Sequence, residues 1–168
     1  MKKLLAIVVM LTALMASQAF AQSANANVNL TVNNALSVTS NRVNGLNFGA
    51  GVPGGAITVQ DIAGALAANA AQFTILGSAN TNVTITVTNS GNLTDAPNPS
   101  IPWSMTCSYS NAATPAQGTS TDFTLTNPTT QPTNASGNVL IWVGGTVNIP
   151  AGTASGQYAG TVTVSVTY

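Results

Sequence analysis

The amino-acid sequence predicts an all-β fold, a single antiparallel β-sandwich. Short segments in which polar residues alternate with β-branched or aliphatic ones recur along the chain, and Gly, Pro, Asn and Ser separate them. The last segment, Tyr158–Tyr168, alternates almost without interruption. Because successive side chains of a strand point to opposite faces, this pattern is typical of sheets with one buried and one solvated face.

The first residues have the features of a secretory signal peptide. Lys2 and Lys3 give a positive start, residues 4–15 are apolar, and Ala19-Phe20-Ala21 supplies a small-residue cleavage site. We therefore expect residues 1–21 to be removed and the protein to be exported through the periplasm to the cell surface or beyond. The apolar run is shorter than the roughly 20 residues that a membrane-spanning helix needs, so we expect no transmembrane span.

The rest of the chain is expected to form one globular unit. Residues 22–44 are an N-terminal extension with the first strands, and residues 45–168 are the body of the sandwich. In the extension, Val28, Leu30 and Val32 share one face of a predicted strand. The turn signal Asn33-Asn34 separates it from a second short strand that carries Leu36 and Val38.

Further strands and one helix follow in chain order. Ile62, Leu66 and Ala70 keep a spacing of four residues, so we expect a short helix over Asp61–Ala71 with Asp61 as its cap. Segments 91–102, 111–121 and 127–137 are expected to be loops, because they are rich in Pro, Asn, Ser and Thr. The predicted strands are Arg42–Phe48, Ala56–Gln60, Gln72–Leu76, Asn82–Thr88, Trp103–Tyr109, Asp122–Thr126 and Val139–Ile149.

The closing strand has the most regular pattern of the chain. A C-terminus usually frays unless it is held in place, so a regular strand here indicates a role in folding or assembly. Thr161, Thr163, Ser165 and Thr167 share one of its faces. The residues of the other face are Tyr158, Val162, Val164, Val166 and Tyr168.

Charged residues are few enough to exclude several functions. After residue 21 the chain carries one cation, Arg42, and three anions, Asp61, Asp95 and Asp122, with no Lys, Glu or His. One arginine cannot neutralise a row of phosphates, so we expect no nucleic-acid binding. An enzyme would depend on the three carboxylates alone, so we expect neither catalysis nor a cofactor nor a metal site. A nearly neutral surface favours self-association, and the alternative is a secreted monomer with a neutral polar surface.

Cys107 is the only cysteine, so the chain cannot form an internal disulfide. It alternates with Trp103, Met105 and Tyr109 on one face of a predicted strand, so we expect it in the core. The alternatives are an intermolecular disulfide or a reactive nucleophile, which would lack a histidine partner.

Three strings of residues resemble a bacterial secreted family catalogued as domain of unknown function 4402. The first is Gly45-Leu46-Asn47-Phe48-Gly49 with Val52-Pro53-Gly54-Gly55, and the second is residues 71–87. The third runs from Val143-Gly144-Gly145-Thr146-Val147 to residue 161. The resemblance covers most of the chain from Gly45 onward and departs from the family pattern between residues 98 and 132.

The same family is similar in style to spore-coat-U-type and chaperone-usher pilus subunits. That likeness implies an immunoglobulin-like sandwich in which an alternating N-terminal strand fills a groove bordered by the C-terminal strand. It also implies self-assembly, other surface subunits and a periplasmic chaperone and usher as candidate partners. The disulfide common in pilins cannot form here. The candidate strand-assembly residues are Val28, Leu30, Val32, Tyr158, Val162, Val164, Val166 and Tyr168.

The sequence thus predicts a non-enzymatic structural protein of the cell surface, a pilus-like, fimbria-like or coat subunit assembled through β-strand pairing. Whether the N-terminal strand would pair within its own chain or with a neighbour is left open. The alternative is a secreted adhesion module that binds carbohydrate or a surface as a self-complete monomer. It would use exposed aromatic residues such as Trp103 or Trp142, but both lie in apolar runs and are expected to be buried.

Overall fold

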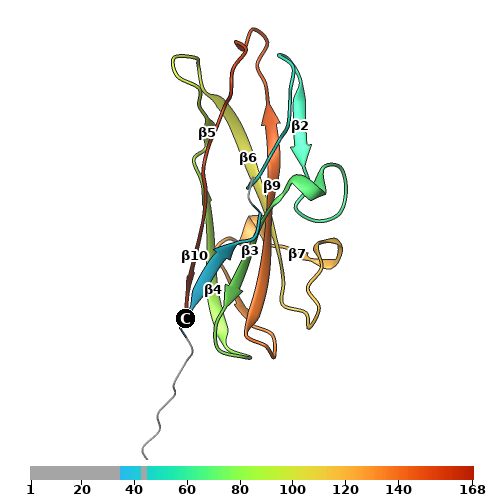
Figure 1. Cartoon of the computed structure of the whole chain (residues 1–168), viewed down its shortest axis with the longest axis vertical. Helices are drawn as coiled ribbons and strands as arrows, with labels where there is room; N and C mark the ends of the chain where they lie inside the picture. Colours follow the sequence, from blue (N-terminus) through green and yellow to red (C-terminus); the bar gives the residue numbers. More distant parts are fainter. Residues whose placement is uncertain (1–34, 43–44) are drawn as a thin grey trace, which may run out of the picture. The chain divides into compact units, whose positions relative to one another are not determined.

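The computed structural model describes residues 35–42 and 45–168, which Figure 1 shows in colour. The pattern of contacts divides the chain into two units, residues 1–32 and 33–168, and all described strands belong to the second. The predicted signal peptide and the predicted strand with Val28, Leu30 and Val32 lie outside the described residues.

Two antiparallel sheets form a β-sandwich. The larger sheet has the strand order β1-β3-β9-β6-β5, with β2 paired to β9 and β7 paired to β6, and the smaller has the order β10-β4-β8. The strands of the larger sheet are β1 (Ser37–Ser40), β2 (Ala56–Val59), β3 (Ala71–Leu76), β5 (Asn92–Leu93), β6 (Ile101–Ser110), β7 (Thr121–Asp122) and β9 (Asn138–Asn148). Those of the smaller sheet are β4 (Asn82–Asn89), β8 (Thr129–Pro132) and β10 (Val162–Thr167).

The topology confirms the predicted immunoglobulin-like sandwich. The order β1-β3-β9-β6 corresponds to strands A-B-E-D of an immunoglobulin sheet, and the pair β4 and β10 corresponds to C and F of the facing sheet. The alternation seen in the sequence decides which side chains lie between the sheets. On β4, for example, Val83, Ile85 and Val87 are buried, whereas Thr84, Thr86 and Thr88 lie on the opposite face.

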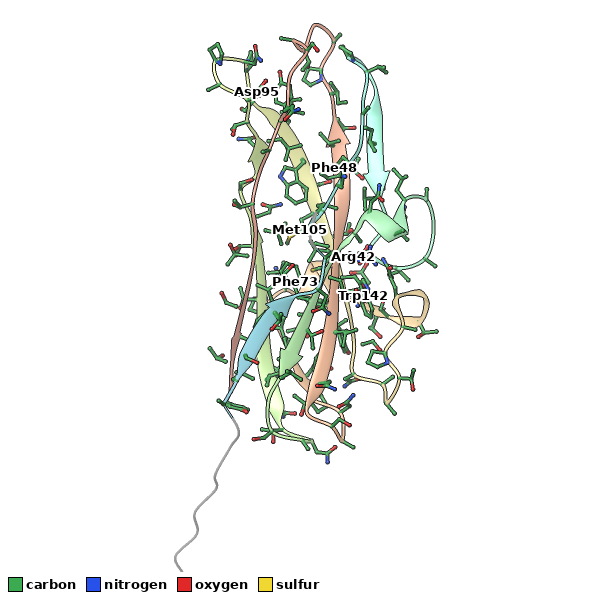
Figure 2. All side chains as sticks on the ribbon, in the orientation of Figure 1. Arg42, Phe48, Phe73, Asp95, Met105 and Trp142 are labelled. Atoms are coloured by element: carbon green, nitrogen blue, oxygen red, sulfur yellow. The ribbon has the colours of Figure 1, made fainter. Side chains whose placement is uncertain are left out.

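Gly144 allows the segment that leaves β2 to cross β9, the longest strand. Strands β3 and β2 pair one after the other with the same side of β9. At the junction a Cβ on Gly144 would lie 2.2 Å from the carbonyl oxygen of Val59, so only glycine fits under the chain leaving β2. The residues that follow β2 in the chain cover the outer face of the larger sheet. Trp142, labelled in Figure 2, is therefore only 2% exposed although it points away from the central core.

Several predicted elements are wrong or shorter than expected. Segment 45–48 is not a strand, and the predicted strand Asp122–Thr126 consists of the end of β7 and the 3-10 helix η3 (Thr124–Thr126). Between Asp61 and Ala71 the helical part is only η1 (Ala67–Asn69), whose N-cap is Leu66, so Asp61 caps no helix. The structure also contains η2 (Gln117–Thr119) and, in segments predicted as loops, β5 and β8. Both strands form beside a neighbouring strand that supplies backbone partners, β6 for β5 and β4 for β8.

No helix in residues 35–42 and 45–168 has the length and apolar character that crossing a membrane would require.

Candidate functional site: the open edge of β10

Among the described residues, strand β10 has a partner strand on only one side. It pairs antiparallel with β4, from Val162 opposite Asn89 to Thr167 opposite Thr84, and no other described strand pairs with it. In an immunoglobulin-type sheet this position, beside strand F, belongs to strand G. Strand G has no counterpart among the described residues. We call the side of Val162–Thr167 that faces away from β4 the β10 edge.

The backbone groups at the β10 edge are those of the three valines. Ala159 exchanges two backbone hydrogen bonds with Thr94, and the carbonyl of Thr161 accepts one from the N–H of Ser90. The backbone N–H and C=O groups of successive residues point to alternate sides of a strand. Those of Thr163, Ser165 and Thr167 therefore point toward β4. The N–H and C=O groups of Val162, Val164 and Val166 therefore point to the open side.

The hydrogen bonds on the far side of β4 agree with this alternation. The N–H and C=O of Val87, which lies opposite Val164, are bonded to the side chain of Asn127 and so point away from β10. Strand β4 therefore uses the intervening threonines to bind β10.

The apolar side chains of β10 are incompletely covered. Val162, Val164 and Val166 are half-buried, whereas the intervening Thr163 and Ser165 are exposed. The three valines pack against the buried main core, and other partly buried apolar residues pack against the same core. In Figure 2, Phe48, Met105 and Phe73 follow one another along the middle of the sandwich between β10 and β9. The partly buried residues around the main core include Leu36, Val38, Leu46, Phe73, Met105 and Tyr109.

The two predicted tyrosines lie beyond the ends of β10. Tyr158 is half-buried and packs against a second core cluster, formed by Ile101, Trp103 and Val147. Its hydroxyl donates to the carbonyl of Ala154 at 3.1 Å. The hydroxyl of Tyr168 accepts from the N–H of Ser78 at 2.9 Å, while 46% of the residue is exposed. Of the candidate strand-assembly residues that the structure describes, only the three valines thus belong to the paired part of the strand.

The three predicted acidic residues have separate hydrogen-bond environments. Asp61 is 5% exposed and its Oδ2 has no hydrogen-bond partner among the described residues. The carboxylate of Asp122 accepts from the N–H of Thr124, and that of Asp95 accepts from the side chain of Asn98. No group of three His, Cys, Asp or Glu residues within 35–42 and 45–168 could hold a metal ion. The absence of catalysis stays a prediction.

Cys107 and both tryptophans are buried, as the sequence predicts. Desolvation by burial raises the pKa of the Cys107 thiol from 9.0 to about 12, with smaller increases from the carboxylates of Asp61 and Asp122. The hydrogen bond with Thr124 acts in the opposite direction. The thiol is therefore protonated at neutral pH and unreactive. Trp103 is 7% exposed and Trp142 is 2% exposed, so neither offers a free ring face to a ligand.

Comparison with protein families matches residues 36–168 to the family described as "Domain of unknown function (DUF4402)". The chain belongs to the DUF4402 family. The match extends through residues 98–132, where the motifs quoted from the sequence depart from the family pattern. It includes the whole of β10 and all strands of both sheets, whereas Val28, Leu30 and Val32 precede it. No curated protein matched the chain.

Proposed function

We propose that this DUF4402 protein is a non-enzymatic structural subunit of a bacterial surface appendage or coat, joined to its neighbours by β-strand pairing. The observation that carries the proposal is the β10 edge. A strand whose backbone groups are unpaired on one side is a template for a strand from another chain. The half-buried valines of β10 give such a strand apolar surface to cover.

The composition of β10 supports the proposal. In proteins that stay monomeric, exposed edge strands commonly carry lysine, proline or a bulge that prevents pairing with another chain. Val162–Thr167 contains only Val, Thr and Ser and pairs with β4 without interruption. With one cation and three anions after residue 21, the chain also lacks the net charge that would keep copies apart.

Two segments of the chain have the alternating, uncharged pattern that a pairing strand needs. One is Asn27–Asn33, with Val28, Leu30 and Val32 on one face, and the other is β10 itself. The predicted signal peptide would deliver the subunit to the periplasm, where a chaperone and usher could cover the same edge before assembly. Export, these partners and the position at the cell surface are parts of the proposal.

The experiment compares the mature chain, residues 22–168, with two lysine variants. S165K places a charge beside the β10 edge, and T88K places one on the same exposed face of β4, away from the edge. Sedimentation should show concentration-dependent oligomers for the parent and T88K, and fewer for S165K. Electron microscopy with an antibody against the chain should show filaments or a coat on the native cell. The proposal is contradicted if the parent chain stays monomeric at millimolar concentration and electron microscopy shows no filaments or coat on the cells.

The alternative of a carbohydrate-binding monomer has less support. Its candidate residues, Trp103 and Trp142, are buried, and a sugar ring would need an exposed aromatic face. Binding on a glycan array by a strictly monomeric chain would favour it over the structural role.

A further inference from the structure

The sequence of β10 reads almost the same in both directions. From Thr161 to Thr167 it is Thr-Val-Thr-Val-Ser-Val-Thr, and reversal exchanges only Thr163 and Ser165. A two-fold interface between identical chains requires a patch that is complementary to itself. An antiparallel strand pair provides such a patch when the strand is symmetric about its midpoint, which here is Val164.

We propose that the strand that pairs with the β10 edge is the β10 of a second copy, antiparallel, about a two-fold axis at Val164. This inference rests on the proposed function and names the partner at the same edge. Because a two-fold interface closes on itself, the pairing gives a dimer, and this dimer is the unit from which the appendage or coat is built. It places Val164 opposite Val164 of the second copy, and Val162 opposite Val166. Thr163 faces Ser165 of the second copy.

The backbone geometry suits this pairing. The valines present their N–H and C=O groups to the open side, and a two-fold axis at Val164 brings each of them opposite another valine. Each valine pair can then exchange two N–H···O=C bonds, as in a regular antiparallel ladder. The two smaller sheets become one continuous sheet in the order β8-β4-β10-β10-β4-β8.

The side chains suit it as well. In antiparallel pairing about an axis normal to the sheet, both sets of valines remain on the inner face and both sets of hydroxyl residues on the outer face. No charged residue lies in β10, so no charge is buried at the seam. A slip by one residue would put valines opposite outward-facing hydroxyl residues, so the hydrophobic pattern fixes the register.

A charge-swap experiment tests the two-fold pairing. Thr163 and Ser165 are exposed on the outer face, so substitutions there leave the core intact. In T163K/S165K the two-fold axis brings two pairs of like charges together, and T163E/S165E does the same with the opposite sign. Each variant alone should have a dimer dissociation constant at least about tenfold higher than the parent. An equimolar mixture should form heterodimers, because every lysine then faces a glutamate. T88K/T130K, on the same face but away from the β10 edge, is the matched control.

Each other outcome overturns the inference in a distinguishable way. If T163K/S165K dimerises like the parent, the two-fold pairing is wrong. If both charged variants are monomeric, their mixture stays monomeric and removal of residues 22–34 also abolishes assembly, then residues 27–33 are the pairing strand. In that case the inference fails and the proposed function stands. If the parent is monomeric at every concentration, both fail.

A disulfide provides an independent measurement. Thr163 and Ser165 of the second copy would form a non-hydrogen-bonded pair with Cα atoms about 4.5 Å apart, which a disulfide can bridge. T163C/S165C should become a covalent dimer on mild oxidation, with both links mapped by mass spectrometry between the two positions. The buried thiol of Cys107 does not compete. Failure of T163C/S165C to form the 163–165 link, in a chain that dimerises, overturns the two-fold arrangement.

Discussion

The two edges of the smaller sheet differ in how completely they are closed. Strand β8 covers only part of β4 and ends at Pro132, a residue without a backbone N–H to donate. Below the start of β8, the side chain of Asn127 takes the place of a strand. It accepts from the N–H of Val87 at 3.0 Å and donates to the carbonyl of Val87 at 2.6 Å. Within the described part of the chain, no strand, proline or side-chain amide closes the open side of strand β10.

This difference shows that the same sheet has a protected edge at β8 and an unprotected one at β10. At β8 a short strand, a proline and a side-chain amide leave little backbone for another chain to pair with. At β10, six residues in regular alternation keep three sets of backbone groups directed outward. The contrast supports the proposal that the β10 edge is reserved for a partner strand.

Opening the β8 edge should have the largest effect on stability. Asn127→Leu leaves the N–H and C=O of Val87, a buried residue, without their partners. We expect a loss of about 2–4 kcal/mol in the free energy of unfolding, measured in urea, because each unsatisfied group costs about 1–3 kcal/mol. Asn127→Asp is the control, since it keeps the acceptor for the N–H of Val87 and should lose less. Equal stability of Asn127→Leu and the parent would show that the amide does not close this edge.

Truncating two valines that face each other across the sheet sharpens the comparison between its centre and its edge. Val87 is 1% exposed, and Val164 opposite it is half-buried. We expect Val87→Ala to cost about 2–3 kcal/mol and Val164→Ala about 1 kcal/mol in dilute solution. If a partner strand covers the β10 edge, the cost of Val164→Ala should rise with protein concentration. A concentration-independent cost equal to that of Val87→Ala would mean that the edge is already fully covered within the monomer.

Cys107 offers a probe that reports on the core behind both edges. Its folded-state pKa is raised, so its contribution to stability is present below pH 9.0 and is lost as the pH rises toward about 12. Unfolding monitored by circular dichroism should therefore show falling stability over this range, and Cys107→Ser should reduce the slope. At pH 8, thiol labelling of the native chain should be slow and should accelerate in Asn127→Leu but not in T163K/S165K. Equal acceleration in both would mean that the β10 edge also opens the core.

Replacing the proline of the closed edge should have the smallest effect on stability. Pro132→Val restores a backbone N–H at an exposed position of β8. We expect a change within about 0.5 kcal/mol, as for most surface substitutions, together with increased self-association measured by light scattering. Thr130→Val, on the same strand, keeps the proline and is the control. If Pro132→Val does not associate more than Thr130→Val, the short length of β8 and Asn127 suffice to protect this edge.

The elements that the sequence predicts correctly are those whose side chains carry the pattern themselves. Strands β3, β4, β6, β9 and β10 alternate apolar and polar residues, and all were expected within a few residues of their bounds. Strand β8, Thr-Thr-Gln-Pro, has no apolar residue among its first three and exists because β4 offers it backbone partners. Segment 45–48 shows the reverse, since Leu46 and Phe48 alternate and pack on the core without pairing as a strand.

The candidate site was only partly predictable for the same reason. The sequence alone determined the faces of the closing strand, the scarcity of charge and of catalytic side chains, and the apolar surroundings of Cys107, because these depend on residue type and spacing. It could not determine which strands lie side by side, because strand partners are chosen over long sequence separations. Only the tertiary structure places β10 at the end of a sheet, gives Val87 the side chain of Asn127 in place of a strand, and leaves the backbone of Val162, Val164 and Val166 directed outward. An edge is a property of the assembled sheet, not of any one strand.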